Sequence, residues 1–258
     1  MRDFATPRDI TRMEDCYFYH TMDLPGIGRI EGDWNLLPNI TEYLGHVSFD
    51  GKRVLDVGCG AGALTFYMEQ HGASVVSYDL DKTGDWDMVP YVKWEQRLNV
   101  EADRKTIIDR LNNAYWLSHK AFNSKAKVVY GSVYDMPDLI GAVDIAVYGS
   151  VLLHLRDPFL ALQNGLRFVR DTVIVADLAG DSETSRPYLG FLPDAKTLEP
   201  KDTWWNLRPQ WVVRAIGVLG FEDTEIIIHT QQYKGQTVYL YTVVGKRTHG
   251  QVIPANPR

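Results

Sequence analysis

A short apolar segment that ends in three alternating glycines constrains the fold of this chain more than any other feature. Val54-Leu55-Asp56-Val57 is followed directly by Gly58-Cys59-Gly60-Ala61-Gly62. The apolar residues are typical of a buried strand, and the glycines allow a tight turn whose backbone can lie close to a ligand. A second apolar run, 74–78, ends at Asp79, where a carboxylate can accept hydrogen bonds from two ribose hydroxyls. The pattern therefore predicts a nucleoside-cofactor site.

Strand and helix patterns alternate along most of the chain, which predicts an α/β fold with a parallel sheet. The last two strands are joined by a close turn at Lys234-Gly235, which implies one antiparallel strand. The expected strands are 53–59, 74–80, 127–134, 144–150, 172–177, 224–230 and 237–244, and the expected helices are 34–44, 61–71, 100–122, 158–169 and 209–219.

Two classes of cofactor fit the glycine turn. The segment 58–63 satisfies the dinucleotide fingerprint of NAD-dependent oxidoreductases, with Asp79 near the place where that fingerprint has its acid. The same turn resembles motif I of the class I S-adenosylmethionine-dependent methyltransferases, and the segments 128–137 and 143–158 resemble that family's third and fourth strands. The resemblance covers roughly residues 34–246. It implies a Rossmann-like, seven-stranded, mostly parallel sheet with an antiparallel last strand, helices on both faces, and S-adenosylmethionine as cofactor.

The resemblance also implies roles for individual residues. The glycine turn would lie under the methionine part of the cofactor, and Asp79 would bind the ribose, with Asp81 as a competing candidate. Ser132 occupies a position where the family often has an acid that contacts adenine. His154, after the fourth strand, would be a general base, or a histidine that hydrogen-bonds the cofactor or packs the turn. The expected cofactor-binding residues are Asp56, Gly58, Cys59, Gly60, Gly62, Asp79, Leu80, Trp86, Ser132, Val133, Gly149 and Ser150.

Two aromatic segments outside the strand pattern are expected to cover the site. The resemblance places such segments over the cofactor as lids, although packing under long loops would explain the aromatic residues equally well. The residues expected to bind substrate are Tyr17, Tyr19, His20, Trp204 and Trp205. The corresponding division is a lid segment at 1–33, a methyltransferase domain at 34–246 with an enlarged connection at 81–126 and a substrate-side insertion at 180–209, and a tail at 247–258.

Composition limits the partners. The net charge of −6 and the pI near 5.6 argue against a large nucleic-acid footprint. Two cysteines give no disulfide framework and favour a reducing cytoplasm. No apolar run approaches the length of a membrane span, and the N-terminus lacks a signal-peptide core. The sequence suggests no metal site, and it does not specify an oligomeric state.

A closer resemblance involves the tRNA wobble-uridine carboxymethyltransferases and their small-molecule relatives. It is carried by Glu31-Gly32-Asp33-Trp34, by Leu153-His154-Leu155-Arg156, and by Trp205-Asn206-Leu207-Arg208-Pro209 ahead of a helix that ends at Leu219-Gly220-Phe221. The chain has no long basic N-terminal region, which disfavours tRNA. The sequence therefore predicts methyl transfer from S-adenosylmethionine to a small organic acceptor. Wobble-uridine methyl or carboxymethyl transfer, an NAD-dependent oxidoreductase and a non-enzymatic cofactor-binding protein are the alternatives.

Overall fold

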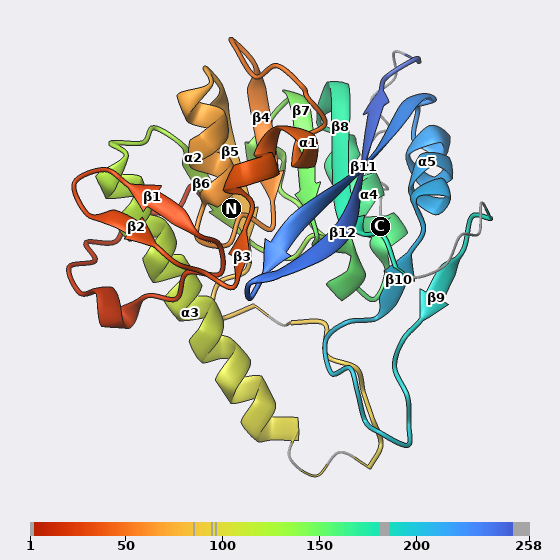
Figure 1. Ribbon diagram of the computed structural model, residues 1–258, viewed down its shortest axis with the longest axis horizontal. Helices are drawn as coiled ribbons and strands as arrows, with labels where there is room; N and C mark the ends of the chain where they lie inside the picture. Colours follow the sequence, from red (N-terminus) through yellow and green to blue (C-terminus); the bar gives the residue numbers. More distant parts are fainter. Residues whose placement is uncertain (1–2, 85, 94, 96, 181–185, 250–258) are drawn as a thin grey trace.

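The computed structural model describes residues 3–84, 86–93, 95, 97–180 and 186–249, so most of the expected tail at 247–258 and part of the insertion at 180–209 lie outside the described residues. The centre of the molecule is a twisted eight-stranded sheet (Figure 1). Its strands, in spatial order, are β3 (Trp34–Asn35), β11 (Asp223–Tyr233), β12 (Gln236–Lys246), β8 (Val169–Leu178), β7 (Val143–Gly149), β4 (Arg53–Val57), β5 (Ser74–Asp79) and β6 (Lys127–Tyr130).

Five neighbouring strands, β6, β5, β4, β7 and β8, are parallel. Within this parallel part, the chain forms β4 first, adds β5 and β6 on one side of it, and then returns to add β7 and β8 on the other. The order of the strands therefore reverses between β4 and β7. Open α/β sheets bind ligands at such a switch point, outside the carboxyl ends of the strands. The glycine turn after β4 lies at this point.

The sheet is larger than the seven strands that the resemblance implied. The penultimate position in the sheet belongs to β11, and β12 runs antiparallel to both β8 and β11. The eighth strand, β3, pairs antiparallel with the end of β11. A helix was expected over 34–44, but the backbone of Trp34 is hydrogen-bonded to the N-terminal segment. Its N–H donates to the Tyr19 carbonyl, and its carbonyl accepts from the Thr21 N–H. The helix α1 (Ile40–Tyr43) is consequently confined to one turn after a short 3₁₀ turn, η2 (Leu37–Asn39).

Helices cover both faces of the sheet. On one face, α1 and α2 (Ala63–Gln70) contribute Tyr43, Leu64 and Met68 to a core against β4, β5 and β7. On the other face, α4 (Pro158–Leu166) and α5 (Pro209–Val218) supply Leu162 and Ile216 to a second core. The α/β Rossmann-like class expected from the sequence is confirmed.

The segments outside the sheet contain more regular structure than the sequence pattern indicated. The N-terminal segment holds a hairpin of β1 (Met22–Leu24) and β2 (Gly28–Ile30), after a 3₁₀ turn, η1 (Met13–Asp15). The segment before α5 holds the pair β9 (Leu189–Phe191) and β10 (Trp205–Leu207). Two further 3₁₀ turns flank β7, namely η3 (Asp138–Ile140) and η4 (Leu152–His154).

A long helix and two loops extend beyond the carboxyl edge of the sheet. The helix α3 (Arg97–Ala121) is 25 residues long and projects past the strands (Figure 1). The loop after β5 and the loop before β10 run side by side there, joined by a 2.8 Å hydrogen bond from Val89 N–H to the Lys201 carbonyl. These three segments form an extra wall over the switch point. Among the described helices, none combines the length and the apolar character needed to cross a membrane.

Candidate functional site

A cavity of about 470 Å³ opens at the carboxyl ends of β4, β5 and β7. Its walls come from the glycine turn, the turns after β5, β6 and β7, the helix α3 and the N-terminal segment. The cavity brings together most of the residues that the sequence singled out: Tyr17, Tyr19, His20, Gly58, Gly60, Asp79, Leu80, Trp86, Ser132, Val133, Gly149, Ser150 and His154.

The glycine turn is held in a shape that side chains would strain or block. Gly58 and Gly60 have φ angles of 76° and 54°, in the left-handed region that favours glycine. A Cβ on Gly58 would lie 2.8 Å from Cγ2 of Val151, whereas a Cβ on Gly60 would meet no atom within 4 Å. Gly60 therefore presents bare backbone to open space, which a ligand can approach closely.

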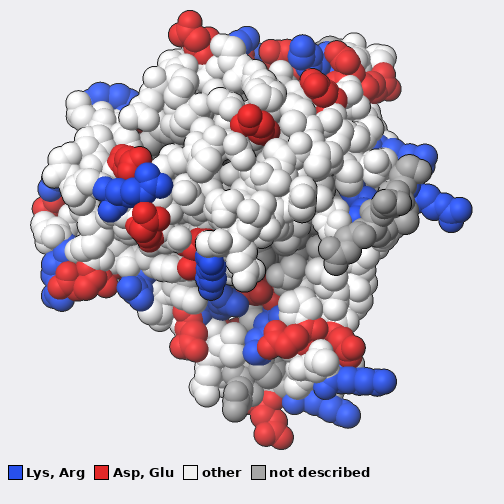
Figure 2. Space-filling model, in the orientation of Figure 1, with Lys and Arg blue, Asp and Glu red and all other residues white. Residues whose placement is uncertain are grey.

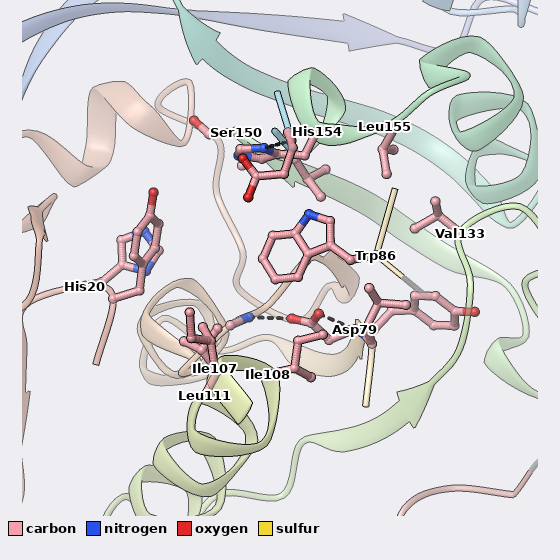
Figure 3. Close-up of a pocket in the computed structure, with 18 of the residues that line it drawn as sticks. His20, Asp79, Trp86, Ile107, Ile108, Leu111, Val133, Ser150, His154 and Leu155 are labelled. Carbon is pink, nitrogen blue, oxygen red and sulfur yellow. Dashed lines mark hydrogen bonds between the residues drawn. The ribbon is translucent and has the colours of Figure 1, made fainter. Parts of the chain in front are cut away.

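Asp79 is tied to this turn through both carboxylate oxygens. Oδ2 accepts the Gly60 N–H at 2.7 Å and Oδ1 accepts the Leu80 N–H at 2.7 Å (Figure 3). Burial raises the pKa of Asp79, and the two N–H donors oppose that shift. A carboxylate has about four lone-pair positions, so it can accept ligand hydroxyls in addition. The competing Asp81 does not line the cavity: its Oδ1 accepts the N–H of Thr83 at 2.9 Å.

Three expected cofactor-binding residues lie outside the cavity lining. Asp56 is buried beneath α2, where Thr65 donates a 2.6 Å hydrogen bond to it and burial raises its pKa to about 7. Cys59 is also buried. Gly62 caps the start of α2, and a Cβ there would lie 2.3 Å from the ring of Phe66. Asp56 and Gly62 thus hold the helix against the strand.

Trp204 and Trp205, which the sequence predicts to contact substrate, form hydrogen bonds with backbone carbonyls next to the cavity. The indole N–H of Trp204 donates to the Asp87 carbonyl at 2.7 Å, and the guanidinium of Arg156 lies 5.1 Å from its ring centroid. The indole N–H of Trp205 donates to the Leu155 carbonyl at 2.9 Å. Neither indole is part of the cavity lining. Both are better described as packing under a long loop, the alternative that the sequence left open.

His154 is held in one tautomer. Its Nδ1 lies 2.7 Å from the backbone carbonyl of Asp202. A carbonyl only accepts, so Nδ1 carries the proton and Nε2 of the neutral ring keeps a free lone pair. Burial lowers the pKa of His154, which keeps the ring neutral near pH 7. The imidazole lies edge-on to Trp86, with ring centroids 6.5 Å apart (Figure 3).

No pattern in the sequence indicates the pair of residues that supports this histidine. Arg104 of α3 forms an ion pair with Asp202, whose carbonyl holds His154, and its guanidinium lies 5.2 Å from the Trp86 ring centroid. Both Arg104 and Asp202 line the cavity. No local pattern joins these positions, because α3 and the loop before β10 meet only in the folded chain.

The turns after β6 and β7 are fixed by tyrosines. The hydroxyl of Tyr78 donates to the Ser132 carbonyl at 2.9 Å, and the Ser150 and Tyr43 hydroxyls lie 3.2 Å apart. Ser150 has a φ of 52°, a conformation uncommon for a residue with a side chain. Gly149 packs so closely that a Cβ would lie 2.9 Å from the Tyr43 hydroxyl. These contacts set the backbone at the cavity's centre.

The N-terminal segment forms an aromatic wall that includes residues the sequence did not assign to the site. Trp34 and Tyr233 are in ring contact at 4.7 Å, and the Trp34 indole N–H donates to the Tyr19 hydroxyl at 3.0 Å. The rings of Tyr19 and His20 are 5.0 Å apart. Burial lowers the pKa of His20 to about 4. Figure 3 shows His20 and Val133 on opposite sides of Trp86, with Asp79 below the indole.

The helix α3 adds an aliphatic floor made of Ile107, Ile108 and Leu111 (Figure 3). The apolar periodicity of the expected helix was the signal that could have found these residues. The charged residues of the lining are mostly acidic. They are one arginine, Arg104, and four aspartates, Asp33, Asp79, Asp87 and Asp202. A cavity with this balance favours a cationic ligand over an anionic one.

Comparison with known proteins gives a short sequence match and a broader structural one. No protein-family model matches the chain. The ubiquinone biosynthesis O-methyltransferase of Nitrosococcus oceani is 46% identical over 57 residues, which is 20% of this chain and 24% of that protein. The chain thus matches about a quarter of the length of this curated relative.

Solved structures share the fold over most of the chain. The N-terminal domain of EvdMO1 with bound S-adenosylhomocysteine has a TM-score of 0.55 at 17% identity, covering 91% of this chain and 92% of that one. The 1,6-didemethyltoxoflavin-N1-methyltransferase of Burkholderia thailandensis, solved with 1,6-didemethyltoxoflavin and S-adenosylhomocysteine, has a TM-score of 0.51 at 13% identity, covering 82% and 77%. A methyltransferase of Methanosarcina mazei has a TM-score of 0.51 at 14% identity, covering 81% and 97%. The chain shares its fold with these three proteins, two of which are methyltransferases and two of which were solved with S-adenosylhomocysteine.

Proposed function

We propose that this protein transfers a methyl group from S-adenosylmethionine to a small organic acceptor. The observation that carries the proposal is the glycine turn tied to Asp79 at the switch point, where it opens on the cavity. The same fold in proteins that bind S-adenosylhomocysteine supports it, as does the short match to an O-methyltransferase.

The cavity suits this cofactor in shape and in charge. The open space at Gly60 can admit the methionine part against bare backbone. Asp79 can accept the ribose hydroxyls, and Val133, Leu80 and Trp86 offer apolar surface for the adenine. The acidic lining favours a sulfonium cation. When bound, S-adenosylmethionine supplies an electrophilic methyl group.

In this proposal His154 is the general base. The Asp202 carbonyl fixes the proton on Nδ1, so Nε2 can take a proton from an acceptor hydroxyl or amine. The aromatic wall and α3 would hold the acceptor at attack distance and exclude water, which supplies much of the rate enhancement in such transfers. Ser150 and Gly149 fix the turn from which His154 projects.

Calorimetry with three ligands tests the cofactor assignment. We expect S-adenosylmethionine and S-adenosylhomocysteine to bind with micromolar affinity and NAD to show no heat of binding. Binding of NAD without binding of S-adenosylhomocysteine would favour the dinucleotide alternative and refute the proposal. A second measurement, transfer of labelled methyl groups to a panel of small acceptors, separates an enzyme from a protein that only binds the cofactor.

Wobble-uridine methyl or carboxymethyl transfer is the alternative with an RNA substrate. The net charge of −6 argues against it, and the face in Figure 2 shows Lys and Arg interspersed with Asp and Glu along its margin rather than gathered in one patch. A tRNA gel-shift assay at 50 and 200 mM salt would reveal such binding as a salt-dependent complex. A cytoplasmic location is part of the proposal, supported by the two free cysteines.

A further inference from the structure

We propose that the acceptor is a neutral planar aromatic molecule that carries the reacting hydroxyl on its ring, a phenol. This inference rests on the proposed methyl transfer and specifies the substrate class of the same cavity. The observations that carry it are the aromatic wall, the hydrogen bonds that already engage the Tyr17 hydroxyl and the Trp34 indole N–H, the acidic lining and the lone pair on Nε2 of His154.

The wall formed by Tyr17, Tyr19, His20, Trp34 and Tyr233 offers ring surfaces to a ligand. Trp34 and Tyr233 are in ring contact, and Tyr19 meets Tyr17 at 6.4 Å and His20 at 5.0 Å. All five residues line the cavity. Aromatic surfaces of this kind bind planar rings by offset or edge-to-face contacts.

Two donors of this wall, the Tyr17 hydroxyl and the Trp34 indole N–H, are already paired within the protein, whereas Nδ1 of His20 is buried without a hydrogen-bond partner. The Tyr17 hydroxyl donates to Oδ2 of Asp33 at 3.0 Å, and Nζ of Lys234 lies 3.6 Å from the same oxygen. The Trp34 indole N–H is directed to the Tyr19 hydroxyl. A sugar or another polyhydroxylated acceptor would need these groups as hydrogen-bond partners and would have to break existing pairs. An aromatic ring needs none of them.

The charges of the lining disfavour an acidic acceptor. Four aspartates and one arginine line the cavity, and the charge of that arginine, Arg104, is matched by Asp202. A carboxylate or phosphate on the acceptor would add negative charge to a lining of four aspartates whose arginine is already ion-paired with Asp202. A neutral acceptor avoids this cost.

The position of His154 explains why the reacting group would be a hydroxyl on the ring. A phenol is a weak nucleophile until its proton is removed, and Nε2 is the atom that can remove it. In the step, the phenol oxygen forms a bond to the methyl carbon while the bond from that carbon to sulfur breaks. The phenolic proton passes to Nε2, and S-adenosylhomocysteine leaves.

The test compares a planar phenol with its saturated counterpart on the protein loaded with S-adenosylhomocysteine. We expect 2-naphthol to bind at least tenfold more tightly in calorimetry than decahydro-2-naphthol, glucose or benzoate. With S-adenosylmethionine, the protein should convert 2-naphthol to 2-methoxynaphthalene. Trp34→Leu should weaken 2-naphthol binding about tenfold, and Trp34→Phe should restore most of it. Tyr239→Ala, which removes an exposed aromatic residue of β12 outside the cavity, is the matched control.

Melting temperature and affinity for S-adenosylhomocysteine show whether each variant is folded, and Tyr233→Leu provides a second variant of the wall. Equal binding of 2-naphthol and its saturated counterpart would overturn the inference, as would tighter binding of glucose or benzoate. Unchanged binding of 2-naphthol in both folded wall variants would do the same. If S-adenosylhomocysteine binds but 2-naphthol does not, the inference alone fails. If S-adenosylhomocysteine does not bind either, the proposed function fails with it.

Discussion

Replacing Asp79 with asparagine tests the cofactor site most directly. The side chain keeps its size, and its amide oxygen can still accept one of the two N–H groups that now reach the carboxylate at 2.7 Å. The substitution removes the negative charge. A hydrogen bond to a charged group contributes about 1.5–3 kcal/mol, so the loss of the ribose contact should weaken S-adenosylhomocysteine binding about 10- to 150-fold.

Isothermal titration calorimetry of the wild type and Asp79→Asn measures this loss. Asp81→Asn is the matched control, because Asp81 lies two residues away and its carboxylate faces Thr83 instead of the cavity. The 2′-deoxy analogue of S-adenosylhomocysteine isolates the ribose: it should bind more weakly to the wild type, and the difference should shrink in Asp79→Asn. Affinity within twofold of the wild type, or an equal loss in Asp81→Asn, would refute the assignment.

Three further substitutions examine the base, the glycine turn and the buried acid. His154→Gln should lower turnover about 10²- to 10⁴-fold while leaving the affinity for S-adenosylhomocysteine nearly unchanged. The activity of the wild type should fall only at pH values below the ordinary histidine pKa of 6.5, because burial lowers the pKa of His154 and a protonated ring cannot act as a base. If His154→Gln lowers turnover less than tenfold and keeps the pH profile of the wild type, this role is contradicted. Gly60→Val should abolish cofactor binding in a protein that still folds, since the new side chain would occupy the open space beside the turn at a strained φ of 54°; normal binding would disprove the placement. Asp56→Asn should flatten the pH dependence of stability. Burial raises the pKa of Asp56 from 3.8 to about 7, so the native protein retains a proton that the unfolded chain has released. As the pH rises from about 4 to about 7, the wild type should therefore lose about 4 kcal/mol more unfolding free energy than the variant. Urea denaturation at the two pH values measures this difference, and an equal slope in the variant would contradict it.

The parts of the fold that the sequence predicted are those determined by neighbouring residues. The buried strand, the glycine turn and the helix after it follow from apolar periodicity and from backbone angles that glycine adopts easily. The alternation of strands and helices was sufficient to predict the parallel part of the sheet. The positions of Asp79 and His154 at the cavity follow from the same rule, because Asp79 ends β5, His154 lies in the turn after β7, and ligands bind at the carboxyl ends of such strands.

The sequence could not predict features that depend on contacts between distant segments. A helix was the natural interpretation of 34–44, yet the Trp34 N–H donates a hydrogen bond to Tyr19 and its ring packs on Tyr233. The pairing of Trp34 with Tyr233 forms the eighth strand of the sheet. The expected contacts of Trp204 and Trp205 with substrate stay a prediction: both residues lie outside the cavity lining, and their indole N–H groups donate to carbonyls behind the wall. Periodicity carries no information about which distant carbonyl will accept a given N–H.

The cavity also has one part set by neighbouring residues and one part set by contacts between distant segments. The part proposed to hold the cofactor is built from turns that follow strands of one rigid sheet, so its geometry changes little unless the sheet itself changes. The part proposed to hold the acceptor joins the N-terminal segment, α3 and the loops after β5 and before β10, and the connection between them depends on individual contacts such as the Arg104–Asp202 ion pair. Substitutions in these segments can therefore alter the shape of the acceptor wall at a small cost in fold stability. Under the proposed function, the acceptor can change while the cofactor stays the same, so the acceptor class must be argued from the wall and not from the fold.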